Sequence, residues 1–239
     1  MSKRFIVDNE NIQIIGDSIT VSGAEVHHIN VLRYNIGDKV YINNNEVLIE
    51  KIGKNVLEGK IVGNLEKRGE PSVNVTLIQS YLKSDKMDYV VQKAVELGVK
   101  NIIPILTKNT VVKLDEKDKI KKVERLSKIA KEAIEQCGRT DNVNIENVTN
   151  LKNIDYTKYD SVLICHEKSN TNLKGVITKI KEYKNIAVIV GPEGGLDEAE
   201  VEEILKFSNT KDILLGERVL RAETAGFMIL SILSYELDN

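Results

Sequence analysis

The 239-residue sequence has little cysteine, no tryptophan and few aromatic residues of any kind. Its two cysteines, Cys137 and Cys165, form no CxxC pair, and the three histidines add no spacing typical of a zinc site. We therefore expect neither a disulfide framework nor a structural metal. Aromatic residues make up 5% of the chain, which argues against a surface that binds single strands mainly by base stacking.

Long apolar runs are absent as well. The run at residues 186–190 is far shorter than the roughly 20 residues that cross a bilayer. The first residues enter a strand-like alternation and lack the apolar stretch of a signal peptide. We therefore expect a cytoplasmic protein with no membrane partner. Hydrophobic residues at 41% and charged residues at 29% are typical of a folded globular chain.

The formal net charge of −2 conceals an uneven distribution of charged residues. Residues 80–140 carry +5, whereas residues 141–239 carry −6 and residues 1–70 carry −1. A basic middle segment can form a surface that faces phosphate groups. Ordinary solvated helices would give the same pattern, and charge alone favours that simpler interpretation.

Two regions of different character meet at the charged stretch 66–72, so we predict domains at residues 1–70 and 71–239. The first region contains short strand-like runs separated by turns, which indicates a small β-barrel. Ser22 and Glu25 have the spacing of a capping box that begins a short helix. The strand-like runs are residues 5–7, 12–15, 39–42, 47–52 and 56–62.

In the second region strands alternate with helices, which predicts an α/β domain with a mostly parallel sheet covered on both faces. Ligands of such sheets bind at the loops that follow the carboxyl ends of the strands. The predicted strands are residues 73–79, 101–106, 143–148, 161–165, 186–190 and 212–215. The predicted helices are residues 85–97, 116–136, 173–183 and 198–207, with a last helix after Ala222.

The strongest local motif is the turn Gly191-Pro-Glu-Gly-Gly195, which follows a buried strand. Asp197 and Glu200 then have the spacing of a helix cap. The glycines permit positive φ angles and close approach of a ligand to the backbone. The motif is neither a P-loop nor GxGxxG, and Glu193 would repel a pyrophosphate. It suits a nucleoside that bears an amine or a sulfonium, although an ordinary strand-to-helix turn explains the composition equally well.

Two further segments combine charged side chains with small residues. The first lies between a buried strand and a helix start, and contains Glu217, Arg218, Arg221, Glu223 and Thr224. Small residues beside it, such as Ala222 and Gly226, indicate close packing against another backbone. The second segment is the end of the basic helix, where Gly138 suits a left-handed cap and Arg139 could neutralise a phosphate or hold a carboxylate.

Together these segments resemble one known family. Residues 73–239 resemble the SPOUT class of S-adenosylmethionine-dependent RNA methyltransferases, and the whole chain resembles the ribosomal RNA small-subunit methyltransferase E family. The motifs that carry the resemblance, in matching order and spacing, are His28-Ile-Asn-Val-Leu-Arg33 with Gly37-Asp38, Lys83-Ser-Asp-Lys-Met87, Gln92-Lys-Ala-Val-Glu-Leu-Gly98, Glu132-Ala-Ile-Glu-Gln-Cys-Gly-Arg139, Gly191-Pro-Glu-Gly-Gly195 and Leu215-Gly-Glu-Arg-Val-Leu-Arg-Ala-Glu-Thr-Ala225. One departure is Cys137, where the family more usually has serine.

The resemblance implies a fold and a cofactor. The fold is a PUA-like RNA-binding β-barrel followed by a SPOUT domain with a parallel sheet and a trefoil knot, assembled as a homodimer. The cofactor is S-adenosyl-L-methionine, held by the glycine turn, the segment 215–220 and the end of the strand 161–165. The implied cofactor contacts are Leu163, Cys165, Gly191, Pro192, Glu193, Gly194, Gly195, Leu215, Gly216, Val219, Leu220 and Thr224.

The resemblance also implies methylation of N3 of a uridine in 16S ribosomal RNA, either free or in the assembled 30S particle. Arg221 and Arg139 are candidates for stabilising charge on the base or for binding the adjacent phosphate. Glu223 or Glu193 could accept the N3 proton, and loss of the proton to solvent is equally compatible. The candidate RNA contacts are Arg4, His28, Arg33, Lys83, Lys86 and Arg139.

Alternatives from other classes remain open. The chain could be a non-catalytic RNA-binding factor in ribosome assembly that keeps the fold without the reaction. It could also be a SPOUT methyltransferase that acts on a ribose 2′-hydroxyl of transfer RNA. Among the single residues, His28 is explained equally well as a satisfied histidine at a helix end.

Overall fold

In the computed structural model, which describes residues 3–66, 70–83 and 85–237, the chain forms two compact units. The first unit comprises residues 1–70 and 135–141, and the second comprises residues 71–134 and 142–239. The sequence carries no sign that residues 135–141 pack with the first unit. Residues 67–69 of the predicted boundary stretch and Ser84 of the Lys83–Met87 motif lie outside the described residues.

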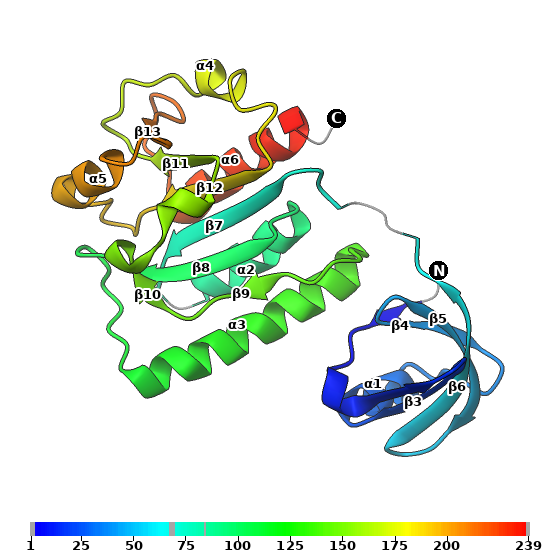
Figure 1. Ribbon diagram of the computed structural model, residues 1–239. Helices are drawn as coiled ribbons and strands as arrows, with labels where there is room; N and C mark the ends of the chain where they lie inside the picture. Colours follow the sequence, from blue (N-terminus) through cyan, green and yellow to red (C-terminus); the bar gives the residue numbers. More distant parts are fainter. Residues whose placement is uncertain (1–2, 67–69, 84, 238–239) are drawn as a thin grey trace. The chain divides into compact units, whose positions relative to one another are not determined.

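The first unit is a six-stranded sheet that curves around one hydrophobic core, with a helix against it (Figure 1). The order of strands is β1-β4-β5-β6-β3-β2, and β1 pairs with β4 in parallel while the other pairs are antiparallel. Alternate side chains of the strands, among them Ile19, Val21 and Ile49, enter the core. The elements are β1 (Arg4–Phe5), η1 (Asn9–Asn11), β2 (Ile12–Ile15), β3 (Ser18–Ser22), α1 (Ala24–Val31), β4 (Lys39–Ile42), β5 (Asn45–Ile52) and β6 (Val56–Asn64).

One local prediction for this unit is wrong. Ser22 is not a helix cap but the last residue of β3, and α1 starts after Gly23 without a side-chain cap. The φ angle of Gly23 is 90°, so the chain turns there through a conformation that glycine tolerates best. The strand β3 was not predicted because only Ile19 and Val21 show its alternation.

Arg4 and Arg139 lie inside the first unit and bind its own groups. Arg4 donates to the backbone oxygens of Asn43 (2.8 Å), Thr140 (2.9 Å) and Arg139. The Arg139 guanidinium forms an ion pair with Glu70, with 2.9 Å between Nη2 and Oε2. Their exposures are only 6% for Arg4 and 4% for Arg139, so neither guanidinium is presented to solvent. Both guanidiniums thus have partners within the first unit, and the contact of Arg4 and Arg139 with RNA and the catalytic role of Arg139 stay predictions.

Glu70 is expected to contribute to stability in a pH-dependent way. Burial alone would raise the pKa of Glu70, but hydrogen bonds from Arg139 and from the backbone N–H groups of Asp141 and Thr140 outweigh it and lower the pKa. The stabilisation is then complete above the ordinary carboxyl pKa and is lost as the pH falls through the lower folded value. At neutral pH we expect Glu70→Gln to reduce the free energy of unfolding by about 2–3 kcal/mol, because it removes a carboxylate charge that pairs with the buried Arg139 guanidinium.

Urea unfolding at neutral pH and through the acid range measures this difference. Glu58→Gln is the matched control, because Glu58 pairs with Lys51 on the surface with a side-chain exposure of 47%. Exposed pairs contribute little, so this control should stay within about 0.5 kcal/mol of the unsubstituted protein. A Glu70→Gln difference that persists in acid, or one no larger than the control's, contradicts the assigned role.

The second unit is a parallel seven-stranded sheet with helices on both faces. The order of strands is β10-β8-β7-β12-β11-β13, and β9 also pairs with β8. The strands are β7 (Asn74–Ser80), β8 (Asn101–Leu106), β9 (Asn144–Ile145), β10 (Thr149–Asn150), β11 (Ser161–Cys165), β12 (Asn185–Val190) and β13 (Thr210–Ile213). The helices are α2 (Lys86–Glu96), α3 (Glu116–Cys137), η2 (Leu151–Asn153), η3 (Tyr156–Lys158), α4 (Leu173–Ile177), α5 (Glu198–Leu205) and α6 (Ala222–Leu237).

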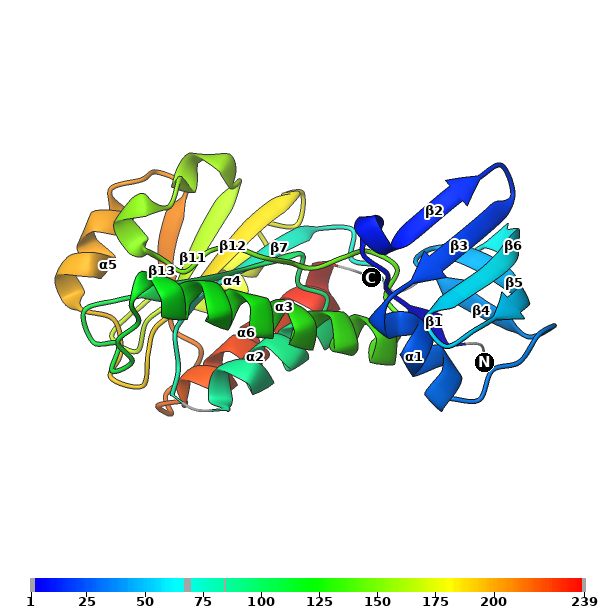
Figure 2. The ribbon, with the colours of Figure 1, turned by 90° about the horizontal axis from the view of Figure 1, so that it is seen from below.

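The two faces of this sheet are buried by different elements. One face carries a cluster in which Ile78, Ile103 and Ile189 lie with Val201 and Ile204 of α5. The helices α2 and α6 lie side by side against the other face (Figures 1 and 2). The predicted α/β architecture with a parallel sheet is thus confirmed, whereas the trefoil knot stays a prediction.

Two predicted elements of this unit have different limits in the structure. Of the strand expected at 143–148, the structure forms β9 at Asn144–Ile145, and β10 follows outside the predicted range; both pair with β8. The helix expected at 173–183 ends at Ile177, and the poor helix formers Gly175 and Thr178 lie in this stretch. Gly98 and Gly138 have φ angles of 89° and 76°, which confirms both as left-handed ends of helices.

Candidate functional site

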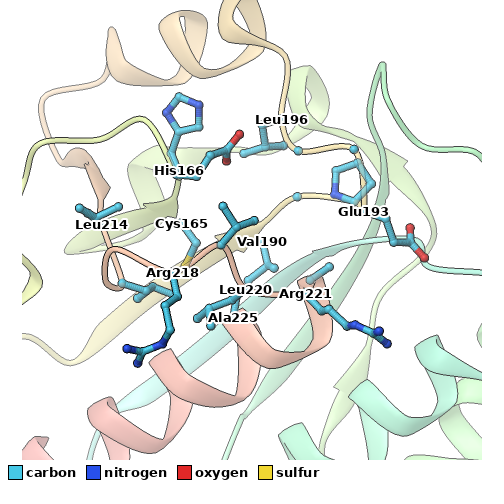
Figure 3. Close-up of a pocket in the computed structure, with 18 of the residues that line it drawn as sticks. Cys165, His166, Val190, Glu193, Leu196, Leu214, Arg218, Leu220, Arg221 and Ala225 are labelled. Atoms are coloured by element: carbon cyan, nitrogen blue, oxygen red, sulfur yellow. The ribbon is translucent and has the colours of Figure 1, made fainter.

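A large cavity lies where loops follow neighbouring strands of the parallel sheet. The four strands β7, β12, β11 and β13 end at the same level of the sheet. In their register, Val190 is opposite both Gln79 and Cys165, and Cys165 is also opposite Ile213. The loops that follow β12, β11 and β13 therefore meet, although they are far apart in the sequence. They enclose a cavity of about 570 Å³ (Figure 3).

The glycine turn 191–195 forms one wall of this cavity. The N–H of Gly195 donates to the Pro192 carbonyl oxygen over 3.0 Å, and Gly195 has a φ angle of 73°. A Cβ atom on Gly191 would lie 3.0 Å from the backbone nitrogen of Leu196, so any other residue requires the turn to shift by a few tenths of an ångström. Asp197 and Glu200 form the predicted capping box of α5, which fixes the end of the turn.

A second segment, residues 107–110 after β8, supports the same turn from outside. The Asn109 side-chain amide donates to the carbonyl oxygens of Gly194 (3.4 Å) and Gly195 (3.2 Å). Lys108 pairs with Asp197 at 2.6 Å, and its hydrogen bond lowers the pKa of the Asp197 carboxyl. The turn is thus held in one conformation by polar contacts that leave its inner side open.

The floor of the cavity is apolar. Figure 3 shows Cys165, Val190, Leu220 and Ala225 gathered at its centre. Burial raises the pKa of the Cys165 thiol to about 12, so this side chain is a neutral packing group at neutral pH. A Cβ on Gly226 would lie 3.5 Å from Gln79 Oε1, which is an ordinary contact distance. The close packing against another backbone that the small residues of this helix indicated stays a prediction.

The rim of the cavity is charged. Arg218 and Arg221 are exposed lining residues that point to different sides, and Arg221 extends to the same side as Glu193 (Figure 3). Within the described part of the chain, no hydrogen bond or ion pair engages either guanidinium. Lys86 also lines the cavity and lies 3.4 Å from Glu193 Oε1 and 3.6 Å from Glu223 Oε1.

The charge state of Glu193 follows from its surroundings. Burial would raise the pKa of Glu193, but its own backbone N–H, Lys86 and the backbone N–H of Lys83 outweigh that effect and lower the pKa. Glu193 is therefore ionised at neutral pH and presents a negative charge at the rim. Such a charge suits a cationic ligand and opposes a pyrophosphate.

The cavity fits a nucleoside that bears a positive charge. Its apolar floor can hold a flat base, and its open glycine turn lets a ligand approach the backbone. His166 lines the cavity, and its Nε2 atom is buried with no hydrogen-bond partner among the described residues. An unsatisfied buried nitrogen of this kind is satisfied when a bound ligand supplies the missing partner.

Most of the predicted cofactor contacts are brought together in this cavity. Ten of the twelve line it: Cys165, Gly191, Pro192, Glu193, Gly194, Gly195, Leu215, Gly216, Val219 and Leu220. Leu163 does not line it, because its side chain is fully buried inside the sheet. Thr224 does not line it either, because it lies on the exposed side of the first turn of α6.

The predicted catalytic residues have different positions. Arg221 lines the cavity, whereas Arg139 belongs to the first unit. Glu223 lies in the first turn of α6 and does not line the cavity, and 14% of its side chain is exposed. The predicted cofactor contacts did not include His166, Glu167 and Arg218, which also line the cavity, although Arg218 lies within the predicted wall 215–220. Their positions in the sequence could have indicated a place in the cavity, because His166 and Glu167 directly follow the predicted strand 161–165 and Arg218 directly precedes Val219.

The remaining RNA candidates are accessible to different degrees. Arg33 and Lys83 are exposed, and Lys86 is half-buried. His28 is 39% exposed, and its ring lies between Lys3 (3.3 Å from Nε2) and Glu25 (3.6 Å from Nδ1). His28 therefore has the local partners expected of a satisfied histidine, and its contact with RNA stays a prediction.

The described residues contain neither a metal-binding cluster nor a helix that could span a membrane. No group of three or more histidine, cysteine, aspartate and glutamate side chains within residues 3–66, 70–83 and 85–237 is arranged to hold a metal ion. In the same ranges, no helix combines the length and the apolar character needed to cross a membrane.

Comparison with known protein families defines the class of this protein. A family model described as an RNA methyltransferase domain matches residues 69–234, and a model described as an RNA methyltransferase PUA domain matches residues 21–62. The fold of the second unit and the cavity at its strand ends agree with this match. The chain is thus a member of the RNA methyltransferases of the SPOUT class, with a PUA domain in its first unit.

Similar sequences narrow the class to one family. A ribosomal RNA small subunit methyltransferase E from Bacillus subtilis is 30% identical over 234 residues, with 92% of this chain and 91% of that protein covered. Its counterpart from Rickettsia conorii is 31% identical over 236 residues, with 95% and 90% covered. The chain belongs to the ribosomal RNA small subunit methyltransferase E family.

Solved structures of similar proteins show the same fold. The ribosomal RNA small subunit methyltransferase E of Neisseria gonorrhoeae, solved with S-adenosyl methionine bound, has a TM-score of 0.83 at 26% identity and covers 98% of this chain and 97% of its own. A chain from Legionella pneumophila, solved with the bound cofactor SAM, has a TM-score of 0.82 at 27% identity, with 98% of both chains covered.

Proposed function

We propose that this protein transfers a methyl group from S-adenosylmethionine to N3 of a uridine in the 16S RNA of the small ribosomal subunit. The family supports a methyltransferase that acts on small-subunit ribosomal RNA, and two similar proteins hold this methyl donor in their structures. The choice of uridine N3 rests on the family resemblance of the motifs.

The observation that supports this proposal most strongly is the meeting of the turn 191–195 and the segment 214–221 around one cavity. The apolar floor would receive the adenine, and the glycine turn would contact the donor through backbone groups. Glu193 would balance its positive charge. When bound, S-adenosylmethionine supplies a methyl group already activated on a sulfonium, so no metal is needed for the transfer.

The residues of this chain must make uracil N3 nucleophilic. Uracil N3 carries a proton at neutral pH, so a bond from N3 to the methyl carbon requires loss of that proton while the sulfur–carbon bond breaks. The products are the N3-methylated base, the neutral thioether and one proton. Arg221, which lines the cavity and has no ion-pair partner among the described residues, would stabilise negative charge on the base carbonyl oxygens as the proton leaves.

The proton acceptor is a separate assignment. Glu193 lines the cavity and is ionised, whereas Glu223 does not line it, so Glu193 is the carboxylate that a bound base reaches more directly. Proton loss to solvent is the remaining route. N3 lies on the Watson–Crick edge, so the target uridine must be unpaired or turned out of its helix.

The resemblance supports two further assignments of partners. We place a second copy of this chain and the assembled 30S particle among them. Val219 and Tyr235 support a homodimer, because 86% and 73% of these apolar residues are exposed on the second unit. The homodimer, the assembled particle as substrate and a cytoplasmic location stay predictions.

Mass mapping of ribosomal RNA tests the function directly. In cells that lack the protein, we expect one 16S fragment to lose the mass of one methyl group, and nucleoside analysis to assign that group to uridine N3. Restoring the gene should restore the methyl group, and restoring Arg221→Ala should not.

Each alternative gives a different result in these measurements. A methyl group lost from a transfer RNA ribose would favour the 2′-hydroxyl enzyme. Calorimetry that shows RNA binding without binding of S-adenosylmethionine would favour a non-catalytic assembly factor. Unchanged masses in both RNAs would contradict the proposed function.

A further inference from the structure

Lys86 occupies an unusual position for a lysine of a basic surface. It is the first residue of α2, half-buried with 36% of its side chain exposed, and it lines the cavity from the loop that follows β7. Its Nζ atom lies between two carboxylates that belong to different walls of the site. Both distances are within the range of direct ion pairs.

The first carboxylate belongs to the glycine turn. Lys86 Nζ lies 3.4 Å from Glu193 Oε1, and this contact helps to lower the pKa of Glu193. Since Glu193 is the central residue of the glycine turn, Lys86 connects α2 to the cavity wall that this turn forms.

The second carboxylate belongs to the first turn of α6. Lys86 Nζ lies 3.6 Å from Glu223 Oε1, and Glu223 Oε2 is buried with no hydrogen-bond partner among the described residues. Lys86 is the only cation in the described part of the chain that forms an ion pair with Glu223. Removal of its charge would leave a carboxylate with 14% side-chain exposure and no counter-charge.

This arrangement differs from that of a phosphate contact. A lysine that binds RNA keeps its ammonium group in solvent and available, as exposed Lys83 does three residues earlier. The ammonium of Lys86 is already shared by two carboxylates. A phosphate would have to displace at least one of them.

We infer that Lys86 is a positioning residue, which joins the glycine turn to the first turn of α6 through Glu193 and Glu223 and so fixes Arg221 against the donor site. Arg221 directly precedes α6, and its carbonyl oxygen accepts from the N–H of Ala225 over 2.9 Å, so its backbone moves with that turn. This inference rests on the proposed function, because it assigns to Lys86 a role in the same site.

The test compares Lys86→Met with Lys86→Arg and Lys83→Met in the full-length protein. We expect Lys86→Met to raise the Kd for S-adenosylmethionine about tenfold and to lower kcat, because one partner of a partly buried charge pair is lost. Lys86→Arg keeps the charge and should stay within about threefold of the unsubstituted protein. Calorimetry and methylation kinetics measure these values.

The salt dependence of RNA binding separates positioning from phosphate contact. Each lost phosphate contact reduces the slope of log K against log salt by about one. We expect Lys86→Met to leave this slope unchanged and Lys83→Met to reduce it. Lys206→Met is the surface control, because Lys206 pairs only with Glu203 of its own helix among the described contacts, and it should change neither quantity.

A double substitution tests the role of the uncompensated carboxylate. If Glu223 without a counter-charge causes the defect, Lys86→Met with Glu223→Gln should bind S-adenosylmethionine at least threefold more tightly than Lys86→Met alone. This recovery also separates positioning from a general loss of folding, which a second substitution would not repair.

Three results would overturn the inference. Lys86→Met could reduce the salt slope with unchanged affinity for the donor, which would make Lys86 a phosphate contact. It could leave both quantities unchanged, or the double substitution could show no recovery. If the unsubstituted protein itself fails to bind S-adenosylmethionine, the proposed function fails first and this inference fails with it.

Discussion

Replacing Arg221 with alanine should lower the rate of methylation by about a hundredfold or more, while the Kd for S-adenosylmethionine changes less than about threefold. The guanidinium lines the cavity and has no ion-pair partner in the described part of the chain, so its hydrogen-bonding capacity is available to a substrate. A donor that stabilises charge developing in the transition state contributes about 3–4 kcal/mol to catalysis. Single-turnover methylation and calorimetry measure the two quantities separately.

Two comparison variants distinguish orientation from charge. Arg221→Lys keeps the charge but loses the planar donor pair, so it should recover only part of the rate. Arg218→Ala removes a cation from the same cavity that points to another side, and a loss below about tenfold is expected (Figure 3). Equal losses of rate and of donor affinity in Arg221→Ala would instead assign Arg221 to the structure of the pocket.

The contrast between Arg221 and Arg139 shows what the sequence can and cannot predict. Both arginines adjoin a helix end next to small residues and carboxylates, and both were candidates for catalysis. The structure buries Arg139 against Glu70, a residue 69 positions earlier, and leaves Arg221 at a cavity. Tertiary contacts between residues far apart in the sequence decide which arginine forms an ion pair with a carboxylate. Local sequence patterns do not contain that information.

The cavity itself was predictable because it depends on strand ends. Buried runs such as β11 and β12 are readily recognised, and in a parallel sheet their carboxyl ends share one edge. The positions that escaped prediction are those whose role depends on side-chain direction. Thr224 is exposed and Leu163 is fully buried on β11, whereas His166, one residue past the end of β11, lines the cavity. The two-residue period of a strand predicts which face of the sheet each side chain lies on. It does not predict the direction of side chains in the loop that follows the strand.

The glycine turn should be the part of the site least tolerant of substitution. A Cβ on Gly191 would lie 3.0 Å from both the backbone nitrogen and the Cγ atom of Leu196, so the turn must move to accept it. At Gly195 the φ angle of 73° adds strain of about 1–2 kcal/mol for any other residue. We expect Gly191→Ala and Gly195→Ala to raise the Kd for S-adenosylmethionine at least tenfold, and Gly191→Val to abolish measurable binding.

Matched alanine substitutions separate the shape of the turn from general damage. Gly194 lies in the same turn, but a Cβ there would be in ordinary contact with Asn109 Cβ at 3.5 Å, so Gly194→Ala should weaken binding much less. Gly175→Ala in α4 meets no atom within 4 Å and should leave binding unchanged. If Gly194→Ala weakened donor binding as much as Gly191→Ala, the conformation of the turn would not explain the loss. Close contact of the ligand with each glycine would explain it instead. Unchanged binding in Gly191→Ala would remove the turn from the donor site altogether.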